Sequence, residues 1–314
     1  MDGKGTDAVE AIMLNKSLQR ITWNAKSLSN MTNLRFLNIC NVDLSEDPEC
    51  LSNELRFLKW HEYPSNSLPS NFRPRNLFEL NLCHSRIKYL WKGKKVLYLN
   101  FIGYIIFQNL KVIELSYSHD LTETPEFLSV PNLEKLHLEG CTGLRKLHES
   151  VAFLKRLIIL NLKGCSNLES FPSNVGGLKL LKIFTLQGCL KLDKIPQNLE
   201  ELECLERLDL GGTAMTQIPS SIAQLRNLEY LSCLSLFLPI RYLFSTCLLL
   251  PPLSGLCCLT TLDLSGSRLS EGALPCDLGS LCFLKELNLS NNNFEILPES
   301  FREFCKKNKI NVFL

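Results

Sequence analysis

The chain has 314 residues, of which 45% are hydrophobic and 21% are charged, and its formal net charge at pH 7 is +2. This is a globular composition with enough apolar material for a core. The near-neutral charge provides no basic footprint for nucleic acid or for an anionic membrane, so we expect neither as a partner.

The N-terminal segment, residues 1–10, reads MDGKGTDAVE and lacks both the apolar core and the cleavage-like site of a secretory signal. We therefore expect a protein of the cytoplasm, or of the nucleus, whose fourteen cysteines are reduced thiols. Two apolar stretches, residues 96–107 and 242–262, are candidates for a membrane span. The first is too short and the second contains Pro251 and Pro252 in its middle, so no membrane span is expected.

A leucine motif of the form L-x-x-L-x-L-x-x-(small or polar) recurs along the chain. Its copies begin at Leu34, Leu55, Leu77, Leu110, Leu133, Leu157, Leu181, Leu205, Leu228, Leu259 and Leu284. A degenerate copy opens at Val9, with Ile12 and Leu14 at the inward positions. Three consecutive steps, from Leu133 to Leu205, are 24 residues each. A fixed period of this length is the signature of a repeat protein.

Alternation within each copy predicts a short strand. In residues 133–141, LEKLHLEGC, Leu136 and Leu138 point to one side while His137 points to the other. One copy cannot bury its leucines alone, but stacked neighbours bury them at roughly 1.5–3 kcal/mol for each fully buried leucine. The pattern predicts an α/β fold, a leucine-rich-repeat solenoid. We expect a curved right-handed superhelix with parallel strands on its concave face and an irregular or short-helical convex side.

The repeats divide the chain into three parts. We expect a degenerate N-terminal capping repeat in residues 1–33, about eleven repeats in residues 34–298 and a non-repeat tail in residues 299–314. Two long steps mark apolar inserts near residues 94–108 and 233–256, which either pack on an edge or the outer face or form a docking patch. The tail carries no further strand motif, which predicts a last repeat covered only by a short charged segment, as in a truncated product or one that needs a partner there.

Two further positions of the repeat have recurring residue types. The ninth position holds short or polar side chains, including Cys141, Cys165 and Cys189. Such side chains can bond to the loop backbone, and one cysteine per repeat does not converge with its neighbours as zinc ligands must, so we expect no metal site. An apolar residue followed by proline recurs in the second half of the repeat, as at Ile218-Pro219, and predicts a turn into the outer side.

No motif for catalysis or cofactor binding is present. The segment Lys92-Gly93-Lys94-Lys95 lacks the leading glycine and the hydroxyl of a phosphate-binding loop, and no G-x-S-x-G, H-E-x-x-H or kinase signature occurs. The residues His61, His84 and His137 fall at outward positions, one on each repeat. A lone surface histidine lacks the orienting partner that general-base catalysis needs. We therefore expect neither an enzyme nor a bound cofactor.

The surface available for binding is the concave face, where the fifth position of each motif forms one row. The residues of this row that we predict to contact a partner are Lys59, Asn81, Glu114, His137, Asn161, Thr185, Asp209, Asp263 and Asn288. The outward residues lean basic in the first seven repeats and acidic in the last four, which favours a protein partner of complementary polarity over a phosphate backbone. The alternative is a solvated face with incidental charge.

Several stretches of the chain resemble a known family. They are GTDAVEAI (5–12), MTNLRFLNI (31–39), LRFLKWHEYPSNSLPSNF (55–72), LFELNLCHSRIKYLW (77–91) and PNLEKLHLEGCTGL (131–144), with Trp60, Tyr63-Pro64 and Leu90-Trp91 as the most distinctive residues. In combination they resemble the leucine-rich-repeat region of plant TIR-type nucleotide-binding leucine-rich-repeat (TIR-NB-LRR) disease resistance proteins, which are intracellular immune receptors.

The resemblance implies a sensor and autoinhibitory role. In that family the repeats read a pathogen effector or a modified host protein and restrain the receptor's own nucleotide-binding domain. The stretch GTDAVEAI follows that domain in the family, so we expect the nucleotide-binding and TIR domains, and with them ADP, ATP and NAD chemistry, to be absent from this chain. The alternative is a substrate-recruiting repeat domain of a ubiquitin ligase, which an F-box motif would favour; none is visible. An extracellular receptor ectodomain would require a signal peptide and paired flanking cysteines.

Overall fold

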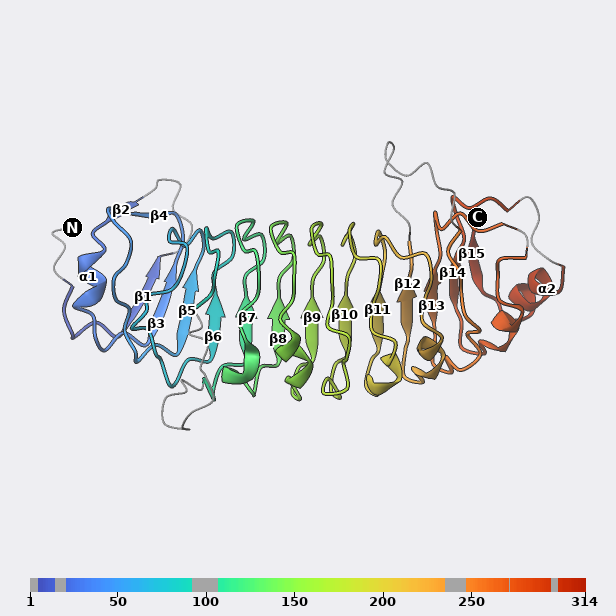
Figure 1. The fold of residues 1–314 in the computed structure, drawn as a ribbon, viewed down its shortest axis with the longest axis horizontal. Coiled ribbons are helices and arrows are strands. Elements are labelled where there is room, and N and C mark those ends of the chain that lie inside the picture. The colour runs from blue at the N-terminus through green and yellow to red at the C-terminus, as the bar shows by residue number, and fades with distance from the viewer. Residues whose placement is uncertain (1–4, 15–20, 92–106, 235–246, 271, 295–298) are drawn as a thin grey trace. The chain divides into compact units, whose positions relative to one another are not determined.

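The computed structural model describes residues 5–14, 21–91, 107–234, 247–270, 272–294 and 299–314. The chain divides into two compact units, Met1–Leu157 and Ile158–Leu314. Each unit is built from short parallel strands that follow one another in chain order (Figure 1). Because each strand pairs with the next strand of the repeat, every unit has the ladder that the leucine period predicts.

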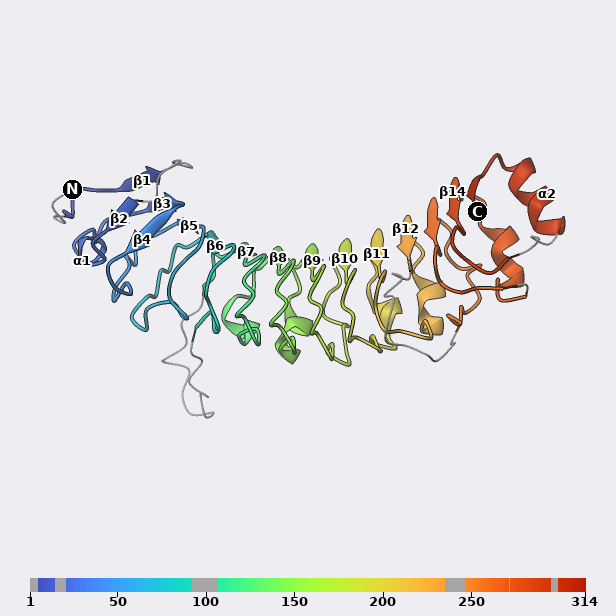
Figure 2. The same ribbon diagram turned by 90° about the horizontal axis from the view of Figure 1, so that it is seen from above.

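Among its described residues, the first unit has six strands in its main ladder. They are β1 (Ala11–Leu14), β3 (Phe36–Ile39), β5 (Phe57–Trp60), β6 (Glu79–Asn81), β7 (Val112–Glu114) and β8 (Lys135–His137), each parallel to the next. A separate parallel pair joins β2 (Ile21–Trp23) to β4 (Val42–Leu44). Its helices are α1 (Lys26–Ser29) and the 3₁₀ turns η1 (Phe127–Ser129) and η2 (Glu149–Phe153). Figure 2 shows η1 and η2 on the side away from the strands.

The second unit repeats this arrangement with seven strands. They are β9 (Ile159–Asn161), β10 (Ile183–Thr185), β11 (Arg207–Asp209), β12 (Tyr230–Ser232), β13 (Thr261–Asp263), β14 (Glu286–Asn288) and β15 (Asn311–Phe313), again all parallel. Its helices are η3 (Leu199–Glu201), η4 (Ser220–Gln224), η5 (Cys276–Ser280) and α2 (Glu299–Lys307).

The register of the strands stacks the inward side chains on one another. Leu58 lies opposite Leu80, and Leu80 lies opposite Ile113. In the second unit Leu160 lies opposite Phe184. All these side chains are fully buried. The predicted α/β leucine-rich-repeat solenoid is confirmed, since the side chains that the period assigned to the core are the ones that water does not reach.

The ninth position of the motif ties each repeat to the one before it. The Cys141 thiol donates to the Leu115 carbonyl at 3.2 Å, and the Cys189 thiol donates to the Leu162 carbonyl at 3.3 Å. Ser118, Ser267 and Asn292 make the same kind of bond. Burial raises the pKa of both thiols to about 12, so they are protonated at neutral pH and can donate. The predicted hydrogen-bonding role of this position is confirmed.

The eighth position adopts a left-handed backbone, which the sequence pattern does not reveal. The residues there are Asn41, Glu62, His84, Tyr117, Gly140, Gly164, Gly188, Gly212, Gly266 and Asn291, with φ between 56° and 77°. Their N–H groups continue the ladder; the Tyr117 N–H, for example, donates to the Glu139 carbonyl at 2.6 Å. Because L-residues are strained in this region, glycine is the usual occupant.

The outer side follows the predicted proline turns. Pro219 and Pro275 precede η4 and η5 directly, with extended backbone angles. Serine hydroxyls link neighbouring outer turns: Ser150 Oγ accepts from the Phe127 N–H at 2.7 Å. The predicted short-helical outer side is therefore present in both units.

The C-terminal residues differ from the prediction of a tail without a strand. Residues 299–307 form α2, in which Phe301 and Cys305 are buried, and β15 pairs with β14 so that Val312 lies opposite Leu287. The prediction was wrong because a ladder needs only backbone N–H and C=O groups with one inward side chain, and Val312 meets that need without a leucine motif. The last leucine repeat is thus followed by a further strand.

The two apolar inserts fall largely outside the described residues, which omit 92–106 and 235–246. At their described ends, Phe107 is buried against Trp91 with ring centroids 5.3 Å apart, and Leu249 bonds to the backbone of Thr216 and Ile218. None of the helices in the described ranges is long and apolar enough to cross a bilayer.

Candidate partner-binding surface

The outward side chains of the strands form a surface in each unit, here named the strand face. Register partners place Lys59, Asn81, Glu114 and His137 in one row on the first unit. The same register places Asn161, Thr185, Asp209, Asp263 and Asn288, together with Ser232, in one row on the second unit. The ladder thus brings the predicted residues together within each unit.

Most of this row also has a structural task. The side-chain oxygen of the fifth residue accepts a hydrogen bond from the N–H two residues later. This bond is made at Asn81, Glu114, Asn161, Asp209, Ser232, Asp263 and Asn288, at 3.0–3.4 Å. Asparagine, aspartate and serine favour such turns because the side chain replaces a backbone acceptor where the strand ends. The residue types of the row are therefore explained by the fold before any partner is considered.

Asp209 is less accessible than the sequence pattern predicts. Its side chain is 7% exposed, and its Oδ1 accepts from the Gly211 N–H at 3.1 Å. Burial raises the pKa of this carboxyl, opposed by the Gly211 hydrogen bond and by Arg207. The carboxylate is held by its own turn, so it offers a partner little free charge.

Aromatic side chains form a row on the first unit at the start of the strands. Phe36 begins β3, Phe57 begins β5 and Phe78 directly precedes β6; the ring centroids are 6.0 Å apart between Phe36 and Phe57 and 5.6 Å apart between Phe57 and Phe78. The Lys111 ammonium lies 5.8 Å from the centre of the Phe78 ring. These rings are on the outward side, and Phe78 is 39% exposed. The core does not need aromatic residues there, so they are available for contact.

A second aromatic row lies where the strands of the first unit end. The His61 and His84 rings are 4.6 Å apart, and the His84 and Tyr117 rings are stacked at 4.9 Å. The Tyr117 hydroxyl donates to Glu139 at 2.9 Å. The expectation of lone histidines was wrong for His61 and His84, because the ladder stacks consecutive outward side chains on one another. The third outward histidine, His137, has its Nδ1 atom 4.0 Å from Oε2 of Glu114.

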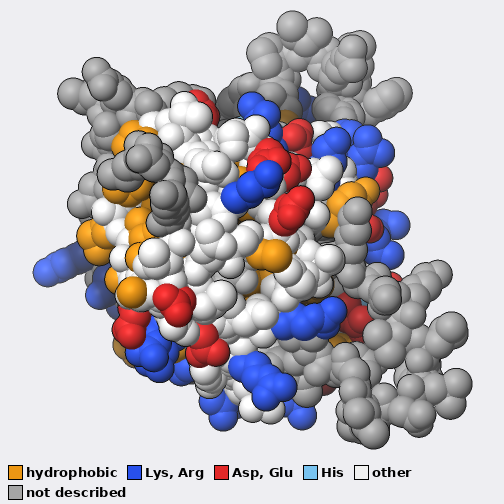
Figure 3. Space-filling view, turned by 90° about the vertical axis from the view of Figure 1, so that its left-hand side faces the viewer, with side chains coloured by type: hydrophobic (Ala, Val, Ile, Leu, Met, Phe, Trp, Pro, Cys, Tyr) orange, Lys and Arg blue, Asp and Glu red, His pale blue; other side chains and the backbone are white. Residues whose placement is uncertain are grey.

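The charges on the strand face are paired across neighbouring repeats. Lys59 lies 2.9 Å from Glu79, and Lys111 lies 2.7 Å from Glu134. In the second unit Lys182 lies 2.6 Å from Glu206. Figure 3, which views the N-terminal end, shows Lys and Arg side chains interspersed with Asp and Glu. We expected an excess of basic residues in the first seven repeats and of acidic residues in the last four. Neighbouring residues of opposite charge therefore balance this excess locally.

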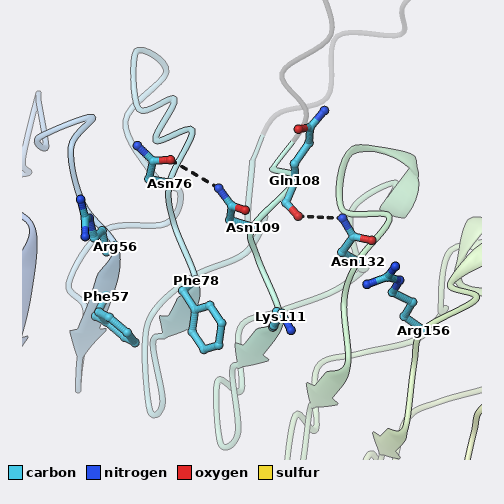
Figure 4. A pocket seen from close by; sticks show the side chains of 9 residues that line it. All are labelled: Arg56, Phe57, Asn76, Phe78, Gln108, Asn109, Lys111, Asn132 and Arg156. Carbon is cyan, nitrogen blue, oxygen red and sulfur yellow. Dashed lines mark hydrogen bonds between the residues drawn. The ribbon is translucent and has the colours of Figure 1, made fainter.

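An open hollow of about 510 Å³ lies beside the first aromatic row (Figure 4). It is lined by Arg56, Phe57, Asn76, Phe78, Gln108, Asn109, Lys111, Asn132 and Arg156. Asparagine amides cross-link its wall: the Asn109 amide donates to Asn76 Oδ1 at 3.4 Å and the Asn132 amide donates to the Gln108 carbonyl at 2.8 Å. The hollow places cationic, aromatic and amide side chains of the first unit around one open space.

Comparison with known proteins shows which proteins this chain is similar to. Two family models, both described as Leucine Rich Repeat, match this chain, one at residues 76–95 and the other at residues 258–281 and 283–304. "Disease resistance-like protein DSC1" of Arabidopsis thaliana is 35% identical over 170 residues, covering 50% of this chain and 13% of that protein. "Disease resistance protein RPV1" of Vitis rotundifolia is 37% identical over 182 residues, covering 49% and 12%. Over about half of its length the chain is thus similar to plant disease resistance proteins, and three of its segments match leucine-rich-repeat models.

The fold of this leucine-rich-repeat protein also matches solved structures. The leucine-rich-repeat ectodomain of the plant membrane receptor kinase GASSHO1/SCHENGEN3 from Arabidopsis thaliana, solved with CASPARIAN STRIP INTEGRITY FACTOR 2, has a TM-score of 0.65 at 22% identity. The match covers 91% of this chain and 33% of that one. This likeness supports the solenoid fold, and the resemblance of the sequence to plant disease resistance proteins is confirmed by the curated relatives.

Sequence reasoning missed the aromatic rows of this leucine-rich-repeat protein. The signal was present, because Phe36, Phe57 and Phe78 occupy outward positions of the motif, where a solvated strand would carry polar residues. Their significance depended on the register of neighbouring strands, which places the three rings in contact. The distinctive Trp60 and Tyr63 prove to be core residues instead, fully buried with their rings edge to face at 5.1 Å.

Proposed function

We propose that this chain is the protein-recognition and regulatory module of an intracellular plant immune receptor, and that it acts by binding without catalysis. Its partner is a pathogen effector or a modified host protein, and the module also contacts the receptor's own nucleotide-binding domain. The strand face of residues 5–157 is the contact surface. Homology to disease resistance proteins supports the defence role, and the matched relatives give the ubiquitin-ligase alternative no support.

The observation that carries this proposal is the pair of aromatic rows on the first unit. Exposed aromatic side chains are enriched at the energetic centres of protein interfaces, because they bury a large area at a small cost in conformational entropy. Here they flank a row of polar residues whose charges are already paired, as at Lys59 and Glu79. Such a surface favours a protein over a polyanion. The chain spans about an eighth of its matched relatives, and we carry over none of the activities of their other parts.

Affinity purification from healthy and infected leaf tissue tests the proposal. The bait is the full chain, compared with the variant His84→Ala/Tyr117→Ala, which shortens two exposed side chains of the second aromatic row. The matched control is Phe153→Ala, which removes a 64% exposed ring from η2 on the outer side. We expect one or a few defence-related proteins to be retained by the wild type and the control and reduced about tenfold or more by the double variant. Equal retention by all three baits would refute the proposed surface.

A further inference from the structure

The hollow of the first unit has an unusual lining for a surface of mixed charge. Arg56, Lys111 and Arg156 contribute cationic groups, Phe57 and Phe78 contribute rings, and none of the described residues that line it carries a carboxylate. The remaining wall is made of amide side chains. A ligand that fits this lining carries negative charge together with apolar groups.

The charge of the hollow is only partly balanced by its surroundings. Lys111 is engaged by Glu134 at 2.7 Å. The guanidinium groups of Arg56 and Arg156 are exposed, and within the described part of the chain neither has an ion pair. Both guanidinium groups are therefore available to a ligand, and each can form a bidentate hydrogen-bonded pair with a carboxylate.

The distribution of these groups sets the length of the ligand. Figure 4 shows Arg56 at one end of the hollow and Arg156 at the other, beyond Asn132. Arg56 belongs to the copy of the motif that begins at Leu55, and Arg156 directly precedes the copy at Leu157, four copies further along the chain. At about 4.8 Å per copy this is roughly 19 Å, which an extended chain rising about 3.3 Å per residue spans with about six residues. A single small anion does not span it.

The centre of the hollow suits a polypeptide. The tilted rings of Phe57 and Phe78, 5.6 Å apart, offer an apolar surface between the cationic ends. The amide groups of Asn109 and Asn132 are engaged through their nitrogen atoms, and their Oδ1 atoms accept no hydrogen bond from any described residue. An amide oxygen in that state can accept a backbone N–H from an extended segment.

We propose that this hollow binds an extended acidic segment of a protein partner, in which carboxylates at the two ends meet Arg56 and Arg156 and an apolar side chain between them packs on Phe57 and Phe78. This site rests on the proposed protein-recognition function and names the partner's chemistry. Nucleic acid also combines negative charge with flat rings. It is disfavoured because the three cations that line the hollow are too few and too widely separated to follow a phosphate backbone.

Binding to designed probes tests the site with the full chain. The probe is a fluorescent peptide of about eight residues in which glutamate alternates with phenylalanine and leucine, long enough to span the hollow. The same peptide with lysine in place of glutamate, and an oligothymidine of equal negative charge, serve as comparisons. We expect saturable binding of the acidic peptide, seen by fluorescence anisotropy, and tighter binding than of either comparison probe.

Charge reversal locates the binding. Arg56→Glu and Arg156→Glu are each expected to weaken the acidic peptide by about tenfold, and together by about a hundredfold, because the two sites are too far apart to couple. The control Arg226→Glu reverses an exposed arginine just before β12, outside the hollow, and is expected to change the affinity less than about twofold. Circular dichroism checks that each variant is folded.

The outcomes separate this inference from the proposed function. Loss of affinity in Arg226→Glu equal to that in Arg56→Glu, absence of saturable binding up to about 1 mM, or tighter binding of the oligothymidine would each overturn the acidic-peptide site. If the peptide fails while His84→Ala/Tyr117→Ala still releases the cellular partner, only the hollow is refuted. If the double variant also retains every partner, the proposed strand-face function fails with it.

Discussion

The two units are built on the same ladder but differ at the left-handed eighth position. In residues 158–314 most of these positions are glycine, as at Gly164 and Gly188, and the backbone adopts positive φ without strain. In residues 1–157 most carry side chains, as at His84 and Tyr117, although the same backbone costs an L-residue on the order of 1 kcal/mol. Where the fold tolerates that cost, the side chains stack into a surface. The first unit therefore carries outward side chains at this position, as the proposed contact surface requires, whereas the second mostly carries glycine.

The aromatic content of the two strand faces shows the same contrast. The first unit places two rows of rings at the two ends of its strands. On the described strand face of the second unit, the comparable contact is between Arg207, whose guanidinium lies 3.5 Å from the ring centre, and Tyr230. The ladder brings neighbours into register in both units, so the difference comes entirely from which residues occupy the outward positions.

The largest expected effect concerns the core that both units share. Leu80→Asp and Leu160→Asp each place a carboxylate among fully buried side chains, at an expected cost of more than about 4 kcal/mol. We expect each to abolish the cooperative melt of its own unit, followed by circular dichroism and by hydrogen exchange resolved along the chain. Asn161→Asp, an outward change to a residue found at the same position in other repeats, is the control. A melt of Leu160→Asp equal to that of the wild type would contradict the repeat assignment.

The next effect sharpens the contrast at the eighth position. Gly188→Ala is expected to destabilise the protein by about 1–2 kcal/mol through its φ of +77° alone. Gly140→Ala is expected to cost more, because its new Cβ would lie 2.5 Å from Cδ1 of the Tyr117 ring. Urea denaturation measures both. In a Tyr117→Ala background the excess cost of Gly140→Ala should disappear, and its persistence there would show that the ring is not responsible.

A smaller effect is expected from pH at the buried thiols, one example in each unit. Burial raises the pKa of Cys141 and Cys189 from 9.0 to about 12, so the folded state holds these protons more tightly than the unfolded chain. Their contribution to stability is complete below pH 9 and is lost as the pH rises from 9 toward 12, by about 1.4 kcal/mol per thiol for each pH unit. Cys189→Ser should reduce this slope in urea titrations at pH 8 and pH 10. An unchanged slope would mean that the thiol does not ionise on unfolding.

The smallest effect is expected from equivalent ion pairs on the two strand faces. Lys182→Ala removes a half-exposed partner of Glu206 at the surface, and we expect no measurable shift in the melting midpoint. Lys111→Ala also removes a cation near the Phe78 ring, and we expect a loss of about 0.5 kcal/mol. Differential scanning calorimetry compares the two variants. If Lys182→Ala lost more stability than Lys111→Ala, the Phe78 ring would not be stabilising the Lys111 ammonium.

The sequence by itself determined the repeat, its strands and its buried leucines. Each repeat buries its inward side chains only against neighbours of the same kind, so a fixed period leaves one way of stacking. It also determined the role of the ninth position, since a short donor such as Cys141 is what a loop carbonyl requires. The sequence also located the row of fifth-position residues. It could not show that side chains such as Asn81 and Asp263 accept a hydrogen bond in their own turn, which is a structural role, and so could not distinguish that role from partner binding.

Only the tertiary structure decided which outward side chains meet. Contact between His61 and His84, or between Phe57 and Phe78, depends on the register of strands that are more than twenty residues apart in sequence. The hollow between Arg56 and Arg156 needs several repeats at once. The strand β15 was likewise invisible in advance, because it is formed by backbone hydrogen bonds rather than by a leucine pattern. The period of the sequence predicts which side chains are buried in a solenoid. Which outward side chains touch one another is decided only when the repeats stack.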